Sequence, residues 1–298
     1  MAEITLLDGS IGQELVKRSG DRATPLWSTQ VMIDHPEMVG AVHADYFACG
    51  ATVATTNTYA VHRSRLERVG LEDQLQRLLD TALGQAEAAR SANEGGRIAG
   101  ALGPLLASYR PDLKPDVTFA GERFAEIVNL MADRVDLLLA ETVSSLQEAQ
   151  GVFAGVASSD KPLWIAFSVD DDDASKLRSG EALRDILPLI AVHKPAAVLL
   201  NCSTPEAINA GLPIIAQAGV PYGAYANGFT KISDGFKSDF PTVDALTARN
   251  DLSPATYADC AMAWVDQGAT IIGGCCEVGP AHIAEIAKRL RAAGHTIT

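Results

Sequence analysis

The sequence has few cysteines, no long apolar run and no excess of basic residues. Its 298 residues include five cysteines, 24 lysines and arginines, and 37 aspartates and glutamates, which give a formal net charge of −13. A nucleic-acid surface needs a basic patch, so this balance argues against nucleic acid as a partner. No apolar stretch approaches the roughly 18 residues that indicate a membrane span. We therefore expect small-molecule substrates, with neither nucleic acid nor a membrane as a partner.

The N-terminal segment lacks the form of a signal peptide, because Glu3 leaves only a short apolar run. An odd number of cysteines in a chain of this length without an export signal favours reduced thiols. These features predict a cytoplasmic protein, and we expect it to be a monomer or a small homo-oligomer.

Eight short apolar runs alternate with longer segments of helical spacing. The runs are residues 4–9, 51–59, 97–104, 135–142, 162–170, 196–203, 221–228 and 269–276. Segments between them, such as 72–92 and 253–268, place apolar residues at positions i, i+3 and i+4, as amphipathic helices do. Near-continuous apolar strands alternating with helices indicate a covered parallel sheet. Eight such units predict an α/β fold, a (β/α)8 TIM barrel that forms a single domain over residues 1–298. A doubly wound open sheet is the alternative.

Polar or metal-binding residues stand where the apolar runs end. Among them are Asp8, Tyr59, Glu141, Cys202 and Cys276. Barrel enzymes carry their chemistry at the C-terminal ends of the strands, which all open at the same mouth. The pattern therefore predicts one functional site at that mouth.

Three of the five cysteines belong to these strand ends. Cys202 closes the sixth run, and Cys275 with Cys276 closes the eighth. A disulfide between the adjacent pair is disfavoured, because neighbouring Cα atoms are only about 3.8 Å apart. Two buried structural cysteines are the simpler alternative for the pair. Gly273 and Gly274 can let the strand end distort, so that both thiols face the cavity.

Three converging thiolates are a ligand set typical of Zn²⁺. Catalytic zinc takes three protein ligands and keeps a fourth position open, whereas a structural site wants four. A substrate thiol entering that position would be deprotonated and could attack an electrophilic carbon. The other two cysteines, Cys49 and Cys260, fall in helical segments and are interpreted as core residues.

Two further features are interpreted as structural. The acidic run 170–173 follows the fifth apolar run and is typical of a solvated loop, with attraction of a cationic ligand as the alternative. The six histidines form no metal-binding set, and no HExxH motif is present.

The motifs at the strand ends resemble those of the homocysteine S-methyltransferase family. They are DGSIGQEL at 8–15, TTNTY at 55–59, GALGP at 100–104, ET at 141–142, NCS at 201–203 and IIGGCC at 271–276. The resemblance extends from about residue 6 to residue 286. It implies a zinc-dependent barrel that transfers a methyl group from a sulfonium or quaternary ammonium donor to the thiolate of homocysteine, giving methionine. The family places zinc on Cys202, Cys275 and Cys276.

The resemblance also implies roles for other residues. Asp8 and Glu141 would hold the amino-acid part of homocysteine, with the backbone of Gly9 close by; the alternative for Asp8 is to orient a loop. Tyr59 would wall the pocket or lie over a cationic donor. Asn227 lies where relatives carry a similar turn, and its alternative role is to shape that turn.

Asn201 is expected to position Cys202 through a hydrogen bond.

The donor and the acceptor stay open. The chain is similar to the short S-methylmethionine-type members, yet S-methylmethionine, S-adenosylmethionine and betaine-like compounds all stay open as donors, and another thiol or selenol stays open as acceptor. The alternative function is a non-catalytic zinc- or thiol-binding barrel that works with a separate methyl-carrying protein. Hydrolysis by a zinc-bound water is disfavoured, because three thiolates weaken the metal as a Lewis acid.

Overall fold

A closed ring of parallel strands forms the centre of the molecule. The computed structural model describes residues 1–20, 24, 26–113, 115–232 and 246–298. The strands are β1 (Glu3–Leu6), β2 (Val53–Thr55), β3 (Arg97–Leu102), β4 (Leu137–Val143), β5 (Leu163–Phe167), β6 (Ala197–Asn201), β7 (Tyr222–Tyr225) and β8 (Ile271–Ile272). They pair in parallel from β2 through β8 to β1, and a bridge between Leu7 and Val53 joins β1 back to β2. All eight predicted strands are confirmed, and so is the barrel.

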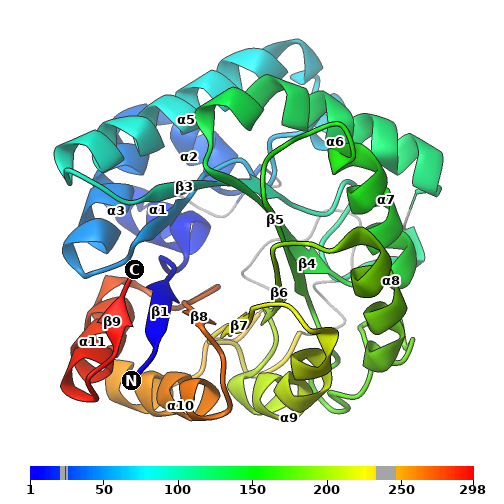
Figure 1. Ribbon diagram of the computed structural model, residues 1–298. Coiled ribbons are helices and arrows are strands. Elements are labelled where there is room, and N and C mark those ends of the chain that lie inside the picture. The colour runs from blue at the N-terminus through cyan, green and yellow to red at the C-terminus, as the bar shows by residue number, and fades with distance from the viewer. Residues whose placement is uncertain (21–23, 25, 114, 233–245) are drawn as a thin grey trace.

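Helices surround this ring, as Figure 1 shows. They are α1 (Ile11–Ser19), α2 (Ser28–Asp34), α3 (Pro36–Ala48), α4 (Arg63–Leu66), α5 (Leu75–Ala92), α6 (Val117–Met131), α7 (Leu146–Val156), α8 (Ile186–His193), α9 (Pro205–Ile215), α10 (Pro254–Asp266) and α11 (Pro280–Ala292). Short 3-10 helices are η1 (Glu67–Val69), η2 (Glu72–Gln74), η3 (Pro111–Leu113), η4 (Ala132–Arg134), η5 (Leu183–Asp185) and η6 (Ala216–Ala218).

Several helices start at a side chain that caps them. Each cap accepts a hydrogen bond from a backbone N–H of the first turn, which would otherwise lack a partner. These caps are Ser10, Asp116, Ser145, Thr204 and Ser253. Ser10 lies in the site motif after β1, and Thr204 directly follows the one at the end of β6, so the caps also fix where the chain leaves the barrel mouth.

A ninth strand was not predicted. β9 (Thr296–Ile297) pairs in parallel with the start of β1, and the two chain ends lie side by side in Figure 1. With only two residues, this strand has too little periodicity to stand out in the sequence. Within the described residues, no helix is both long and apolar enough to span a bilayer.

Side chains alternate between the barrel interior and the layer beneath the helices. In β4, Leu137 and Leu139 belong to an inner cluster that includes Leu7, whereas Leu138 packs in the core under the helices. Alternation along a strand has a period of two residues. The next inward position after Leu139 is Glu141, which therefore lies at the mouth of the barrel.

Candidate functional site

One cavity at the mouth of the barrel gathers most of the predicted site residues. Its volume is about 170 Å³. Its walls include seven of the eight predicted residues, namely Asp8, Gly9, Tyr59, Glu141, Cys202, Cys275 and Cys276. The walls also include residues that sequence analysis missed, among them Trp27, Arg65, Tyr109 and Tyr225. Asn227 does not line the cavity.

Three thiols converge on one wall of this cavity. The sulfur atoms of Cys202, Cys275 and Cys276 all lie within 4.8 Å of one another, and no other group of three or more His, Cys, Asp or Glu residues in the described part of the chain could hold a metal ion. Cys202 Sγ lies 2.6 Å from Cys275 Sγ and 3.9 Å from Cys276 Sγ. Hydrogen bonds from the other two thiols hold the pKa of Cys202 well below its usual range, and the bonds to Cys202 raise the pKa of Cys275 and Cys276. The three sulfurs therefore share protons in the metal-free protein, and a bound metal would displace them.

The end of β8 reaches this wall because two glycines bring neighbouring strands very close. A Cβ on Gly273 would lie 2.5 Å from Leu7 Cβ, and one on Gly274 would lie 2.2 Å from Val278 Cγ1. The strand β8 ends at Ile272, and the turn begins at Cys276. Backbone hydrogen bonds continue through Cys275 to Ala226, so the structure shows no distortion at the two glycines. The glycines instead allow the close approach of β1 and of the loop beyond the cysteines.

Cys202 has an unusual backbone conformation, with φ at 50°. Positive φ is uncommon for residues other than glycine and often marks functional sites. The carbonyl of Cys202 accepts hydrogen bonds from Ser168 Oγ at 3.3 Å and Arg178 Nη2 at 3.2 Å. Two donors from the region after β5 thus hold this cysteine in place.

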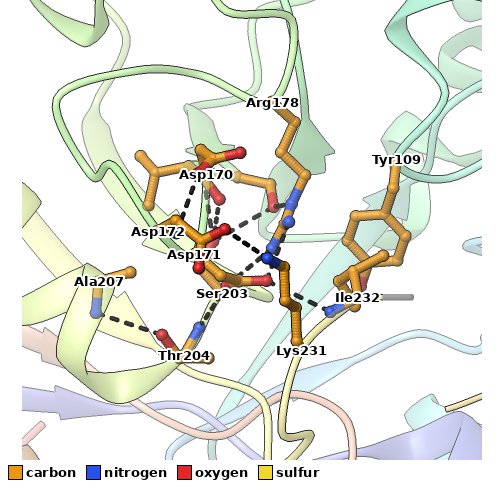
Figure 2. A network of polar contacts seen from close by, with 12 residues as sticks. Tyr109, Asp170, Asp171, Asp172, Arg178, Ser203, Thr204, Ala207, Lys231 and Ile232 are labelled. Carbon is orange, nitrogen blue, oxygen red and sulfur yellow. Dashed lines mark hydrogen bonds and ion pairs between the residues drawn. The ribbon is translucent and has the colours of Figure 1, made fainter. Parts of the chain in front are cut away.

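Arg178 belongs to a buried ion-pair network beneath Cys202 (Figure 2). Its guanidinium contacts both oxygens of Asp171 at 3.1 Å, and only 9% and 4% of the two side chains are exposed. Asp171 also accepts the backbone N–H of Thr204 at 3.0 Å. This pair ties the loop after β5 to the start of α9.

The expectation of a solvated loop at residues 170–173 is therefore wrong for Asp171. Its neighbour Asp172 is exposed and pairs with Lys231, as Figure 2 shows. A run of four acids gave no indication that one of them faces inward, because its partner Arg178 stands seven residues away in an irregular loop.

Tyr109 contacts the thiol cluster directly and had no signal in the sequence. Its hydroxyl donates to Cys202 Sγ at 2.9 Å, and Arg178 lies over its ring at 5.0 Å from the centroid. Tyr109 comes from the loop after β3, where no strand or helix periodicity constrains the position of a side chain.

Two carboxyl groups line the same cavity. Asp8 accepts hydrogen bonds from Thr55 N at 2.6 Å and Thr55 Oγ1 at 2.8 Å, and burial raises its pKa to about 7. Glu141 accepts one from Tyr225 Oη at 3.1 Å. Burial, together with the nearby charges of Asp8 and Cys202, raises the pKa of Glu141 to about 8. Burial disfavours the charged carboxylate, and among the described residues no cation pairs with either acid.

Two other predicted residues have defined neighbours. The hydroxyl of Tyr59 hydrogen bonds with Ser108 Oγ at 2.7 Å, and the Arg65 guanidinium lies over the Tyr59 ring at 5.4 Å. Asn227 accepts the backbone N–H of Phe229 through Oδ1 at 3.1 Å. That contact belongs to the turn-shaping alternative for Asn227.

Asn201 does not bind Cys202 as expected. Its side chain accepts from Thr142 N at 3.0 Å and donates to Thr142 Oγ1 at 3.2 Å. Thr142 has φ at 60°, so Asn201 supports a second left-handed residue, directly after Glu141. Ser168 and Arg178 perform the role that was expected of Asn201.

The remaining cysteines and histidines have structural neighbours. Cys49 and Cys260 are half-buried and pack against the main core, as predicted. His193 stacks on Phe153 at 4.1 Å between ring centroids, and Nδ1 of His282 accepts the backbone N–H of Gly279 at the start of α11. None of the six histidines lines the cavity.

Comparisons with known proteins agree with this site. The sequence model of the homocysteine S-methyltransferase family matches residues 5–290. A homocysteine S-methyltransferase of Escherichia coli (strain K12) is 28% identical over 305 residues, covering 96% of this chain and 95% of the relative. A selenocysteine methyltransferase of Astragalus bisulcatus is 26% identical, covering 96% and 92%.

A solved structure gives the same result. The crystal structure of the homocysteine methyltransferase MmuM from Escherichia coli, in its metallated form, matches with a TM-score of 0.81 at 27% identity, covering 96% of each chain. The family match spans nearly the whole barrel, including the three cysteines. This chain belongs to the homocysteine S-methyltransferase family.

Proposed function

We propose that this protein transfers a methyl group from a sulfonium or quaternary ammonium donor to the sulfur of homocysteine, with Zn²⁺ held by Cys202, Cys275 and Cys276. The observation that carries the proposal is the shared cavity, which is lined by three clustered thiols and two buried carboxyl groups. Homocysteine offers the complementary groups, a thiol at one end and an ammonium at the other. Its chemistry therefore matches both sets of side chains at once.

The three thiols fit zinc by their chemistry. Sulfur ligands suit Zn²⁺, and three protein ligands with one open position are typical of catalytic zinc. In a tetrahedral site with Zn–S bonds of about 2.3 Å, neighbouring sulfurs lie about 3.8 Å apart. The Cys202–Cys276 distance of 3.9 Å is close to this value, whereas Cys202 and Cys275 are closer together at 2.6 Å. When bound, the metal would lower the pKa of the substrate thiol and make it a nucleophile at neutral pH.

The carboxyl wall would hold the amino-acid end of homocysteine. An ammonium placed between Asp8 and Glu141 would favour their ionised forms and lower the raised pKa of each. The backbone beside Gly9 lies on the same wall. Asn227 would support this wall from behind, through the turn after β7.

The reaction forms one bond and breaks one. A lone pair of the homocysteine sulfur forms a bond to the donor methyl carbon, while the bond from that carbon to the donor sulfur or nitrogen breaks and its electrons stay on the leaving group. The thiol proton is released, so the products are methionine, a neutral demethylated donor centre and one proton. The protein contributes alignment, which can be worth roughly 7–11 kcal/mol in favourable cases.

The test is methionine formation by the purified, reduced, zinc-loaded protein. Homocysteine would be mixed with methyl-labelled S-methylmethionine, S-adenosylmethionine or betaine, and labelled methionine measured by mass spectrometry. Cys202→Ala should lose both zinc and turnover, whereas Cys260→Ala, a half-buried helix cysteine, should keep both. Full turnover by Cys202→Ala would refute the proposal. Methionine that forms only after a methyl-carrying protein is added would favour the non-catalytic alternative.

A further inference from the structure

An arginine at the cavity wall has only neutral partners. Arg65, in α4, lines the cavity and donates to the carbonyl of Pro104 from Nε at 3.2 Å and from Nη2 at 2.9 Å. Nη2 also donates to Ser108 Oγ at 3.2 Å, and the guanidinium lies over the Tyr59 ring. Among the residues that the structure describes, no carboxylate pairs with Arg65, and its Nη1 makes no hydrogen bond.

The lack of a carboxylate partner among the described residues distinguishes Arg65 from its neighbour Arg63. Acidic residues outnumber basic ones by 37 to 24, and Arg63, two residues earlier in the same helix, pairs with Glu126. Burial lowers the pKa of Arg65, and the neighbouring charge of Arg68 also disfavours its charged form. Arg68 lines the same cavity. A half-buried cation beside a second cation is costly unless an anionic ligand binds between them.

The loop after β3 connects this arginine with the thiol cluster. Ser108 contacts Arg65 and Tyr59, and the next residue, Tyr109, contacts Cys202. The guanidinium and the thiols are thus connected through two consecutive residues of one loop, and both line the cavity that also contains Asp8 and Glu141. Nη1 of Arg65 supplies two N–H donors that no described residue accepts, and a guanidinium binds a carboxylate especially well.

We propose that Arg65, assisted by Arg68, is the group that binds the carboxylate of the methyl donor. The inference rests on the proposed function. Homocysteine carries its carboxylate on the same carbon as its ammonium, so that carboxylate lies beside the wall of Asp8 and Glu141. Arg65 contacts neither of these acids. The donor needs an anionic group away from its methyl centre, and donors without one should be poor substrates.

This assignment also changes the role of Tyr59. One face of its ring is covered by the Arg65 guanidinium. Tyr59 therefore orients the arginine through that contact and through Ser108. A cationic donor centre over the same face would meet a like charge.

The experiment compares donors that differ only in the carboxylate. S-methylmethionine, betaine and dimethylsulfoniopropionate are each paired with the corresponding amide, and the reaction with homocysteine is followed for wild type, Arg65→Met and Arg65→Lys. Arg63→Met is the matched control, because Arg63 lies in the same helix and pairs with Glu126. Donor binding without homocysteine is measured by calorimetry in the same panel, so that the inference is tested even without turnover.

We expect Arg65→Met to lower kcat/KM about 10- to 100-fold for the best carboxylate donor, and to weaken its binding similarly, since hydrogen bonds to charged groups are of this strength. The amide should be poor for wild type and no worse for the variant, and KM for homocysteine should not change. Arg65→Lys should recover part of the loss, and Arg63→Met should resemble wild type.

Three results would overturn the inference. Equal losses for carboxylate and amide donors would make Arg65 structural. A loss expressed in the KM of homocysteine alone would assign the carboxylate to the acceptor. Wild-type binding that does not distinguish carboxylate from amide would exclude a carboxylate site. Absence of methionine from every donor, with selective carboxylate binding kept, would instead refute the proposed function and leave the Arg65 site standing.

Discussion

Two arginines stack on tyrosine rings at this barrel mouth, and they differ in their counterions. Arg178 lies over Tyr109 and pairs with the buried Asp171. Arg65 lies over Tyr59, and its partners among the described residues are neutral, chiefly the Pro104 carbonyl and the Ser108 hydroxyl. The paired arginine sits beneath Cys202, where it holds the backbone of a proposed metal ligand. The unpaired one lines the cavity. Charges that support the site are neutralised within the protein, and charges that meet the ligand are left for the ligand to neutralise.

The same distinction applies to the acids. Asp171 has a guanidinium, whereas Glu141 has only the hydroxyl of Tyr225. Its raised pKa keeps Glu141 largely protonated near neutral pH until a cation binds beside it, and Arg65 in the same cavity is a cation with no carboxylate partner among the described residues. Such a cavity suits substrates that carry both signs of charge, as amino acids and onium carboxylates do.

Replacing Arg178 should have the largest effect on stability. Arg178→Met leaves Asp171 buried without its cation, which typically costs about 3–5 kcal/mol. Urea unfolding of the metal-free protein would measure the change. The double variant Arg178→Met with Asp171→Leu should recover most of the loss, because no uncompensated charge then stays buried. Arg134→Met, whose pair with Glu87 is about one third exposed, should lose roughly 1 kcal/mol at most. If Arg178→Met loses no more stability than Arg134→Met, Arg178 does not have this role.

Replacing Glu141 should change how stability depends on pH. Burial raises its pKa from the ordinary 4.5 to about 8, so the folded protein binds more protons than the unfolded chain between these values. The contribution of Glu141 to the free energy of unfolding therefore falls as pH rises from about 4.5 to 8. Glu141→Gln should remove this pH dependence, and the variant should be more stable than wild type near pH 8 by a few kcal/mol.

Urea unfolding of the metal-free protein at pH 5, 6.5 and 8 measures the slope. Glu87→Gln is a suitable control, because Glu87 is paired with Arg134 and its pKa is lowered. If the free energy of unfolding depends on pH in the same way for wild type and Glu141→Gln, ionisation of Glu141 does not destabilise the folded protein.

Replacing Arg65 should change stability only slightly, and in the opposite direction to replacing Arg178. Arg65→Met removes a half-buried cation that lacks a carboxylate and keeps apolar contact with Tyr59, so the free energy of unfolding should rise by up to about 1 kcal/mol. The same urea titration measures it. A loss comparable to that of Arg178→Met would mean that Arg65 is needed for folding, and the contrast between the two arginines would disappear.

The sequence predicted the parts of this site that belong to regular strands. Glu141 and Cys202 follow apolar runs whose period and ends locate the barrel mouth, and the paired cysteines close the eighth run. These features depend on local patterns, which is why the barrel and the thiol cluster could be predicted together.

The loops carried no comparable signal. Tyr109, Arg178 and Arg65 lie in the loops or short helix after β3, β5 and β2, where no periodicity fixes a side chain. Asp171 was misjudged for the same reason, because its partner is a loop residue. Asn201 follows the inward period of β6, and its amide bonds Thr142 across the barrel mouth, although sequence proximity favoured Cys202.

Removing the hydroxyl of Tyr109 should have the smallest effect. Tyr109→Phe keeps the ring beneath Arg178 and deletes the O–H that donates to Cys202 Sγ. One such hydrogen bond is worth about 1 kcal/mol, so turnover or metal affinity should fall about fivefold. Tyr222→Phe is the matched control. Tyr222 stands at the start of β7, away from the cavity, and its hydroxyl donates to the carbonyl of Gln267. Both variants should lose similar stability, and only Tyr109→Phe should weaken zinc binding in a chelator competition. Equal zinc affinities would assign Tyr109 to packing beneath Arg178, and the thiol cluster would then rely on Arg178 and Ser168 for its support.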